Sequence, residues 1–133
     1  MSQENVELAK RWEEAFTRYD WAAIDTLMTF DFEWFPALAG VLEGHGYHGR
    51  EGFARYVREL EQTWADLLVF VVEFRDLGDR VVSLGRMEGR GRASGVTVDR
   101  PVGTIYDFRG GKLSRVRVVL AHEEALRVAG LAD

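Results

Sequence analysis

The stretch that decides the fold is residues 67–120, LLVFVVEFRDLGDRVVSLGRMEGRGRASGVTVDRPVGTIYDFRGGKLSRVRVVL. Three turn signals divide it, at residues 77–79, 93–95 and 109–112, each with at least one glycine. The segments between the turns are rich in β-branched and aromatic residues, which favour strands. Strands joined by such short turns are antiparallel neighbours, so the stretch predicts a four-stranded meander.

Helical periodicity dominates the segments outside this meander. Apolar side chains at three- and four-residue spacing predict helices over residues 3–19 and 50–64, and Asp20 suits the N-cap of a short second helix. Between them we expect a short strand, residues 32–35, and a loop, residues 36–48; residues 123–131 can form a closing helix. The chain of 133 residues fits a single domain, residues 1–133, of α+β class, with helices packed on one face of a curved antiparallel sheet.

The first strand of the meander, Leu67–Phe74, is apolar on both of its faces. One face must meet the helices, and the other would meet water in a monomer unless a partner covers it. The pattern therefore predicts a homodimer through the convex face of the sheet.

Composition excludes several classes of partner and site. A net charge of −5 argues against nucleic acid, and the longest apolar run, Leu67–Val72, is far too short to span a bilayer. The chain has no cysteine, so disulfides and thiolate sites are excluded, and its charged N-terminal stretch lacks the apolar core of a signal peptide. We expect a cytoplasmic protein that needs no metal or other cofactor.

Four segments together resemble the SnoaL-like family of the nuclear transport factor 2-like superfamily. They are DWAAIDTL, DFEWFP, HGRE and DFRGGKL, and the resemblance extends from about Asn5 to Leu131. It implies a cone, in which a strongly bent sheet wraps around three helices and encloses a pocket. Members of this superfamily include polyketide cyclases, ketosteroid isomerases, epoxide hydrolases, dehydratases and proteins without known activity, so the fold alone does not give the function.

Two classes of function therefore stay open. The first is a cofactor-independent acid–base enzyme of the isomerase, cyclase or hydrolase type, acting on a small apolar organic substrate. The alternative is a non-catalytic protein that binds a small ligand, or a dimerisation module with a vestigial pocket. The isomerase mechanism itself is disfavoured, because its three catalytic positions fall by similarity at Trp12, Phe35 and Gly103 or Thr104, none of which carries the required group.

His122 and Glu33 are the predicted acid–base pair. His122 would continue the inward face of the last strand beyond Leu120, and Glu33 shares a strand face with Phe35. In an apolar hollow, desolvation moves the pKa values of carboxylates and imidazoles toward neutrality, which suits proton transfer. Each also has a structural interpretation, as a hydrogen-bonded strand-end histidine and as a surface or dimer-contact glutamate.

Substrate-binding side chains are expected on inward positions of the helices and strands. The predicted set is Trp12, Phe16, Phe35, Phe53, Tyr56, Arg86, Thr104, Val116, Val118 and Leu120. Residues 44–49, GHGYHG, match a dinucleotide-binding spacing but lack the parallel βαβ context that such a site needs. A metal held by His45 and His48 with Glu43 or Glu51 is likewise disfavoured, because no ligand frame supports it.

Overall fold

The computed structural model describes residues 2–36 and 46–130. The helices are α1 (Ser2–Thr17), α2 (Trp21–Leu27), α3 (Gly49–Thr63) and α4 (His122–Val128). The strands are β1 (Met28–Phe35), β2 (Tyr47–His48), β3 (Trp64–Asp76), β4 (Arg80–Gly91), β5 (Thr97–Arg109) and β6 (Lys112–Val119). The helices and strands predicted from the sequence are all present, with ends that differ by at most four residues, and the two-residue strand β2 lies in the segment predicted as a loop.

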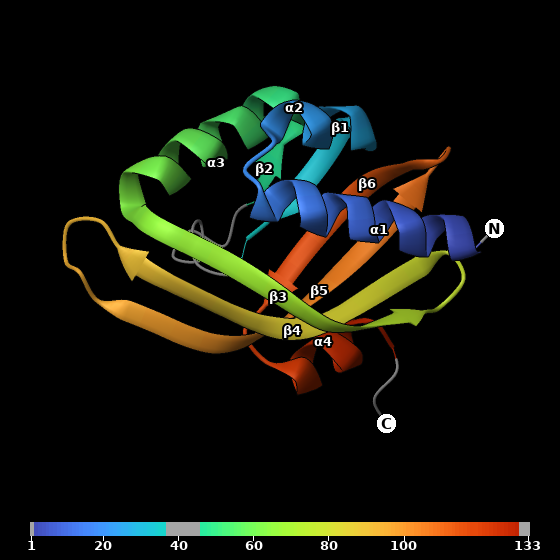
Figure 1. Ribbon diagram of the computed structural model, residues 1–133. Helices are drawn as coiled ribbons and strands as arrows, with labels where there is room; N and C mark the ends of the chain where they lie inside the picture. Colours follow the sequence, from blue (N-terminus) through green and yellow to red (C-terminus); the bar gives the residue numbers. More distant parts are fainter. Residues whose placement is uncertain (1, 37–45, 131–133) are drawn as a thin grey trace.

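A single curved sheet carries the architecture, with strand order β2-β1-β6-β5-β4-β3. Strands β3 to β6 are antiparallel neighbours, which confirms the predicted meander. The first strand returns to the last, and β1 pairs with β6 in parallel. Helices α1, α2 and α3 lie over one side of the sheet (Figure 1).

Side chains of the strands alternate between two apolar layers. The inner face packs against α1 to α3 around residues with almost no exposure, among them Trp12, Phe32, Val81 and Tyr106. The outer face carries a smaller cluster, in which Val82, Leu84 and Ile105 pack against Ala125 of α4. The expectation that all helices pack on one face is therefore wrong for α4, which covers part of the convex side (Figure 1).

Glycine in β4 permits a close approach that bends the sheet. A Cβ atom at Gly85 would lie 2.0 Å from the carbonyl oxygen of Phe70 on β3. The β3–β4 register shifts opposite this glycine, between Val71 and Glu73. The interpretation of the strand glycines as bulge or bend positions is confirmed here.

The chain leaves the sheet earlier at its C-terminal end than the sequence predicts. Strand β6 ends at Val119, and His122 is the first residue of α4. Acidic residues in the first turn, Glu123 and Glu124, favour this helix start because they face its partly positive end. His122 therefore does not continue the inward face of the strand. No helix in the described part of the chain is long and apolar enough to cross a membrane.

Candidate functional site: an aromatic cavity and a neighbouring carboxyl

An apolar cavity of about 160 Å³ lies between the concave face of the sheet and the helices. Side chains from α1, α3 and four strands line it, and most are aromatic or aliphatic. The lining residues are Phe16, Trp34, Pro36, Tyr56, Glu59, Leu60, Thr63, Trp64, Leu67, Val69, Met87 and Val118. No arginine or lysine is among them.

Packed aromatic rings support one wall of this cavity. Trp12, 1% exposed, lies at the centre, with its ring 5.5 Å from those of Trp34 and Phe53 between centroids. Trp34 in turn meets Tyr56 nearly edge-on, with centroids 5.2 Å apart. Such edge-to-face contacts add to area burial and restrict ring motion, so the wall is preorganised in the unliganded chain.

Two hydrogen-bond donors on this wall have no acceptor in the described part of the chain. The Nε1–H of Trp34 is buried without a partner. Tyr56 is 4% exposed, and the structure gives its hydroxyl no hydrogen bond to the described residues. Burial, with a smaller effect of neighbouring Tyr47, raises the pKa of the Tyr56 hydroxyl, so it remains a neutral donor at physiological pH.

Glu59 is the one carboxylate among the cavity-lining residues. The hydroxyl of Tyr47 donates a hydrogen bond to its Oε1. The guanidinium of Arg55 lies 5.1 Å above the Tyr47 ring and steadies this tyrosine by a cation–π contact. The cavity is thus apolar, with a negative charge in its lining.

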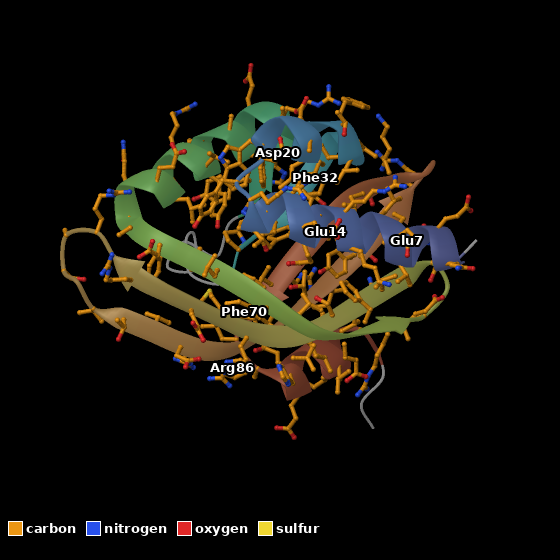
Figure 2. The ribbon with its side chains drawn as sticks, viewed as in Figure 1. Glu7, Glu14, Asp20, Phe32, Phe70 and Arg86 are labelled. Atoms are coloured by element: carbon orange, nitrogen blue, oxygen red, sulfur yellow. The ribbon has the colours of Figure 1, made fainter. Side chains whose placement is uncertain are left out.

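A second hollow, which we call the α1–β3 groove, lies beside this cavity. Its walls are Lys10, Glu13, Glu14, Thr17 and Arg18 of α1 and Val69, Val71 and Phe74 of β3. Val69 lines both hollows. Glu7 and Glu14 mark the side of α1 in view in Figure 2, above the strands of the sheet.

Glu13 brings a carboxyl group into this groove next to a buried polar network. The Tyr106 hydroxyl donates to Glu13 Oε2 and lies 2.8 Å from the Ser83 hydroxyl, with Thr104 as a further hydrogen-bond partner. Desolvation raises the pKa of Glu13 from 4.5 to about 7, although the Tyr106 hydrogen bond opposes the rise. A carboxyl group that titrates near neutrality can both accept and donate a proton under physiological conditions.

Glu33, the predicted base, lies on the outer face of β1 rather than in the cone. Its carboxylate accepts hydrogen bonds from Arg115 at 2.9 and 3.0 Å, and His48 Nδ1 lies 3.5 Å away. It lines a shallow polar hollow together with Asp31, Arg109 and Asp107. Its structural interpretation, a charged residue on the outer surface, fits this environment.

His122, the predicted partner of Glu33, lies half-buried where α4 begins. Its Nε2 is 2.8 Å from the carbonyl oxygen of Gly85, and donates to it in the tautomer that carries the proton there. Neither His122 nor Glu33 lines the aromatic cavity. The structure therefore does not bring this pair together in the hollow where the sequence argument placed it.

The residues predicted to bind substrate fall into three groups. Those that line the cavity are Phe16, Tyr56 and Val118. Those on the inner side but outside its lining are Trp12, Phe53, Thr104, Val116 and Leu120. Those on the outer side are Phe35, beneath the guanidinium groups of Arg115 and Arg117, and Arg86, which pairs with Asp99 and projects away from α1 (Figure 2).

Glu13 and Tyr106 are site residues that the sequence analysis missed, although each carries a signal. Glu13 lies four residues after Ala9 and three before Phe16, so helical spacing places it beside the buried stripe of α1. Tyr106 shares a strand face with Thr104. Helical spacing thus places Glu13 near the core, but the desolvation of its carboxyl follows only from its contact with Tyr106.

Among residues 2–36 and 46–130, no three histidine, aspartate or glutamate side chains are grouped to hold a metal. Two of the metal candidates, Glu43 and His45, lie outside the described residues, as does part of the GHGYHG segment. The prediction that no metal or other cofactor is needed stays a prediction.

Comparison with known proteins identifies the family. The SnoaL-like domain model matches residues 9–116, and the chain therefore belongs to this family, as the sequence resemblance predicted. A search of curated proteins finds no match.

Solved structures share the fold at low sequence identity. A nuclear transport factor 2-like protein of unknown function from Burkholderia pseudomallei is 19% identical, with a TM-score of 0.80, over 96% of this chain and 98% of that one. TerC, co-crystallised with polyporic acid, is 22% identical, with a TM-score of 0.78, over 89% and 92%. A putative polyketide cyclase from Xanthomonas campestris is 23% identical, with a TM-score of 0.74, over 98% of both chains. These similarities confirm the α+β cone.

Proposed function

We propose that this protein binds a small, mostly apolar organic molecule in the aromatic cavity. The observation that carries the proposal is the hollow of about 160 Å³ with aromatic and aliphatic walls. Small-molecule sites have this form, an apolar concavity with a few placed polar groups. The crystal form of TerC with polyporic acid supports the choice of an aromatic ligand class.

The size of the cavity limits the ligand. An apolar cavity of about 150 Å³ accommodates benzene. A cavity of about 160 Å³ therefore fits a molecule with one aromatic ring and a small substituent. A larger ligand would have to extend beyond the lining residues toward the mouth.

A blocking variant tests this proposal. In Val118→Phe the larger side chain would occupy part of the cavity, because Val118 lines it from β6. We expect substituted benzenes to raise the melting temperature of the wild-type protein, as a ligand that binds only the folded state must. The variant should fold and show no such rise.

The matched control is Val96→Phe, the same change at a valine that is 61% exposed and does not line the cavity. It should keep the ligand response of the wild-type protein. A wild-type protein with no response to any ring compound, or a Val118→Phe protein with a full response, would contradict the proposal.

A second candidate function is cofactor-independent acid–base catalysis, of the isomerase, cyclase or hydrolase type. The observation that favours it is Glu13, whose pKa is raised to about 7 in the α1–β3 groove. Structural similarity to two putative polyketide cyclases supports aromatic polyketones as the first substrates to assay. Loss of an essential acid–base group lowers rates roughly 10²–10⁴-fold, so Glu13→Gln should show such a loss, while Glu51→Gln, at an exposed position outside both hollows, keeps full activity.

The proposal also includes a homodimer through the outer face of the sheet. Leu68, Phe70 and Val72 point outward from β3 and are 36%, 47% and 80% exposed. This row supports the association predicted from the apolar pattern of Leu67–Phe74.

A further inference from the structure

The wall of the aromatic cavity contains residues with hydrogen-bond donor groups. Tyr56 lines the cavity, and the structure gives its hydroxyl no hydrogen bond to the described residues, whereas the Trp34 N–H is buried without a partner. Both rings are at least nine-tenths buried, at 4% and 3% exposure. A ligand that supplies an acceptor to the Tyr56 hydroxyl gains a hydrogen bond, whose net contribution is about 0.5–1.5 kcal/mol.

The negative charge in the cavity lining also favours a neutral ligand over an anionic one. Among the described residues that line the cavity, Glu59 is the only one with an acidic or basic side chain of Asp, Glu, Lys or Arg type, so none of them is a cation that could compensate an added negative charge. A carboxylate ligand would lose its hydration without gaining a cationic partner, which is strongly unfavourable. An acceptor oxygen on a neutral molecule meets the Tyr56 donor without that cost.

We propose that the cavity selects a neutral aromatic ligand with a carbonyl oxygen, which accepts a hydrogen bond from the Tyr56 hydroxyl. This inference rests on the proposed binding function and names the ligand class for that site. Ketones, aldehydes and quinones of one ring fit it. Aromatic carboxylates do not fit, because their charge finds no cationic partner in the lining. Aromatic hydrocarbons fit the apolar walls but cannot accept a hydrogen bond from Tyr56.

Binding of three probes of similar size tests the selection. Acetophenone has the carbonyl, ethylbenzene lacks it, and benzoate carries a negative charge. Calorimetric titration of the wild-type protein and of Tyr56→Phe gives four dissociation constants for the two neutral probes. A net hydrogen bond contributes about 0.5–1.5 kcal/mol, so Tyr56→Phe should weaken acetophenone binding about 3- to 10-fold.

Ethylbenzene provides the internal reference. Its binding should be unchanged or tighter in Tyr56→Phe, because the substitution removes only a donor that this probe cannot use. Benzoate should show no saturable binding to either protein. Benzoate binding as tight as that of acetophenone would overturn the inference.

Tyr47→Phe is the matched control variant. The Tyr47 ring packs 5.4 Å from that of Tyr56, but its hydroxyl bonds to Glu59 and the residue does not line the cavity. The ratio of the two dissociation constants should stay at its wild-type value in this variant. An equal change in both variants would overturn the assignment of the donor to Tyr56.

The carbonyl stretching frequency of bound acetophenone gives a second readout. A hydrogen bond to the oxygen lowers this frequency, so it should be lower in the wild-type complex than in the Tyr56→Phe complex. Equal frequencies, with both neutral probes bound, would overturn the inference and leave the proposed binding function intact. Failure of both neutral probes to bind the wild-type protein would instead overturn the binding function itself.

Discussion

A carboxyl group that folding removes from water makes stability depend on pH. The pKa of Glu13 is raised from 4.5 to about 7 in the folded chain, chiefly by desolvation. Between these values the folded state holds a proton that the unfolded state has released. The free energy of unfolding must therefore fall as pH rises through this range, by at most about 3 kcal/mol at 1.36 kcal/mol per unit.

Other charged groups line the same groove as Glu13. They are Lys10, Glu14 and Arg18 on its own helix; from β5, Tyr106 has its pKa raised further from neutrality, and β3 lines the groove with uncharged side chains only. A comparison of variants separates the Glu13 contribution from theirs. Glu13→Gln keeps an acceptor for the Tyr106 hydroxyl and removes the titration.

We predict that Glu13→Gln loses less unfolding free energy than the wild-type protein between pH 5 and pH 8. Chemical denaturation at a series of pH values measures both slopes. Glu14→Gln, an exposed neighbour, should follow the wild-type slope. Parallel profiles for the wild-type protein and Glu13→Gln would show that Glu13 is not desolvated.

The sequence predicted the environment of individual side chains less well than it predicted the helices and strands. Helical spacing placed Trp12 and Phe16 in the core, where the structure has them, because burial follows directly from period. The same spacing also holds Glu13 beside that stripe, but a charge gives no sign of its own burial until the partner, Tyr106 on β5, is known. Contacts between residues so distant in sequence cannot be derived from local pattern.

At the level of elements, the packing of α4 on the outer face depends on one glycine. A Cβ atom at Gly103 of β5 would lie 2.3 Å from the Cβ of Ala125, far inside van der Waals contact. The strand and the helix approach so closely because neither has a larger side chain at this point. Ala125 is fully buried in the cluster with Val82, Leu84 and Ile105.

Gly103→Ala should therefore destabilise the protein by about 1–3 kcal/mol, the usual cost of overpacking. Ala125→Gly alone should cost about 1 kcal/mol from helix propensity. The double variant should cost less than the sum of the two, because removal of one methyl group makes room for the other. Additive free energies of unfolding, measured by denaturant titration, would contradict the contact.

Elements were predicted well where local signals surround them. The turns at residues 77–79 and 109–112 delimit four strands, and the structure places β3 and β4 on either side of the first turn and β5 and β6 on either side of the second. The end of the last strand was misjudged because Leu120 and His122 extend its alternation by sequence, whereas the acidic first turn of α4 already favours a helix there. Where the alternation of a strand overlaps with the acidic first turn of a helix, as at His122, the helix forms.

At the scale of the whole molecule, closure of the sheet depends on pairing that no local pattern encodes. β1 lies in parallel against β6, so Trp34 is paired with Val116, far along the chain. The meander could be derived from turns, but this junction could not, and it is the family resemblance that implied a cone. The junction brings Trp34 and Val118 to the same cavity.

The outer face of this molecule has an uncovered apolar row beside α4. Leu68, Phe70 and Val72 project from β3, and ion pairs of Arg86 with Asp99 and Arg90 with Asp66 flank them on neighbouring strands. An exposed apolar row with a charged border is typical of an interface between copies, since burial of the row removes apolar area from water. We predict a homodimer, with sedimentation equilibrium giving about twice the 15.1 kDa of one chain at micromolar concentration.

A matched pair of substitutions locates this interface on β3. Val72 and Val96 are both exposed, at 80% and 61%, but Val96 lies before β5, outside the row. Val72→Lys places a charge inside the buried contact and should weaken the dimer at least about tenfold, because an unpaired buried charge is costly. Val96→Lys should leave the association unchanged. A wild-type monomer at tens of micromolar, or equal weakening by both substitutions, would show that this row is not where two copies meet.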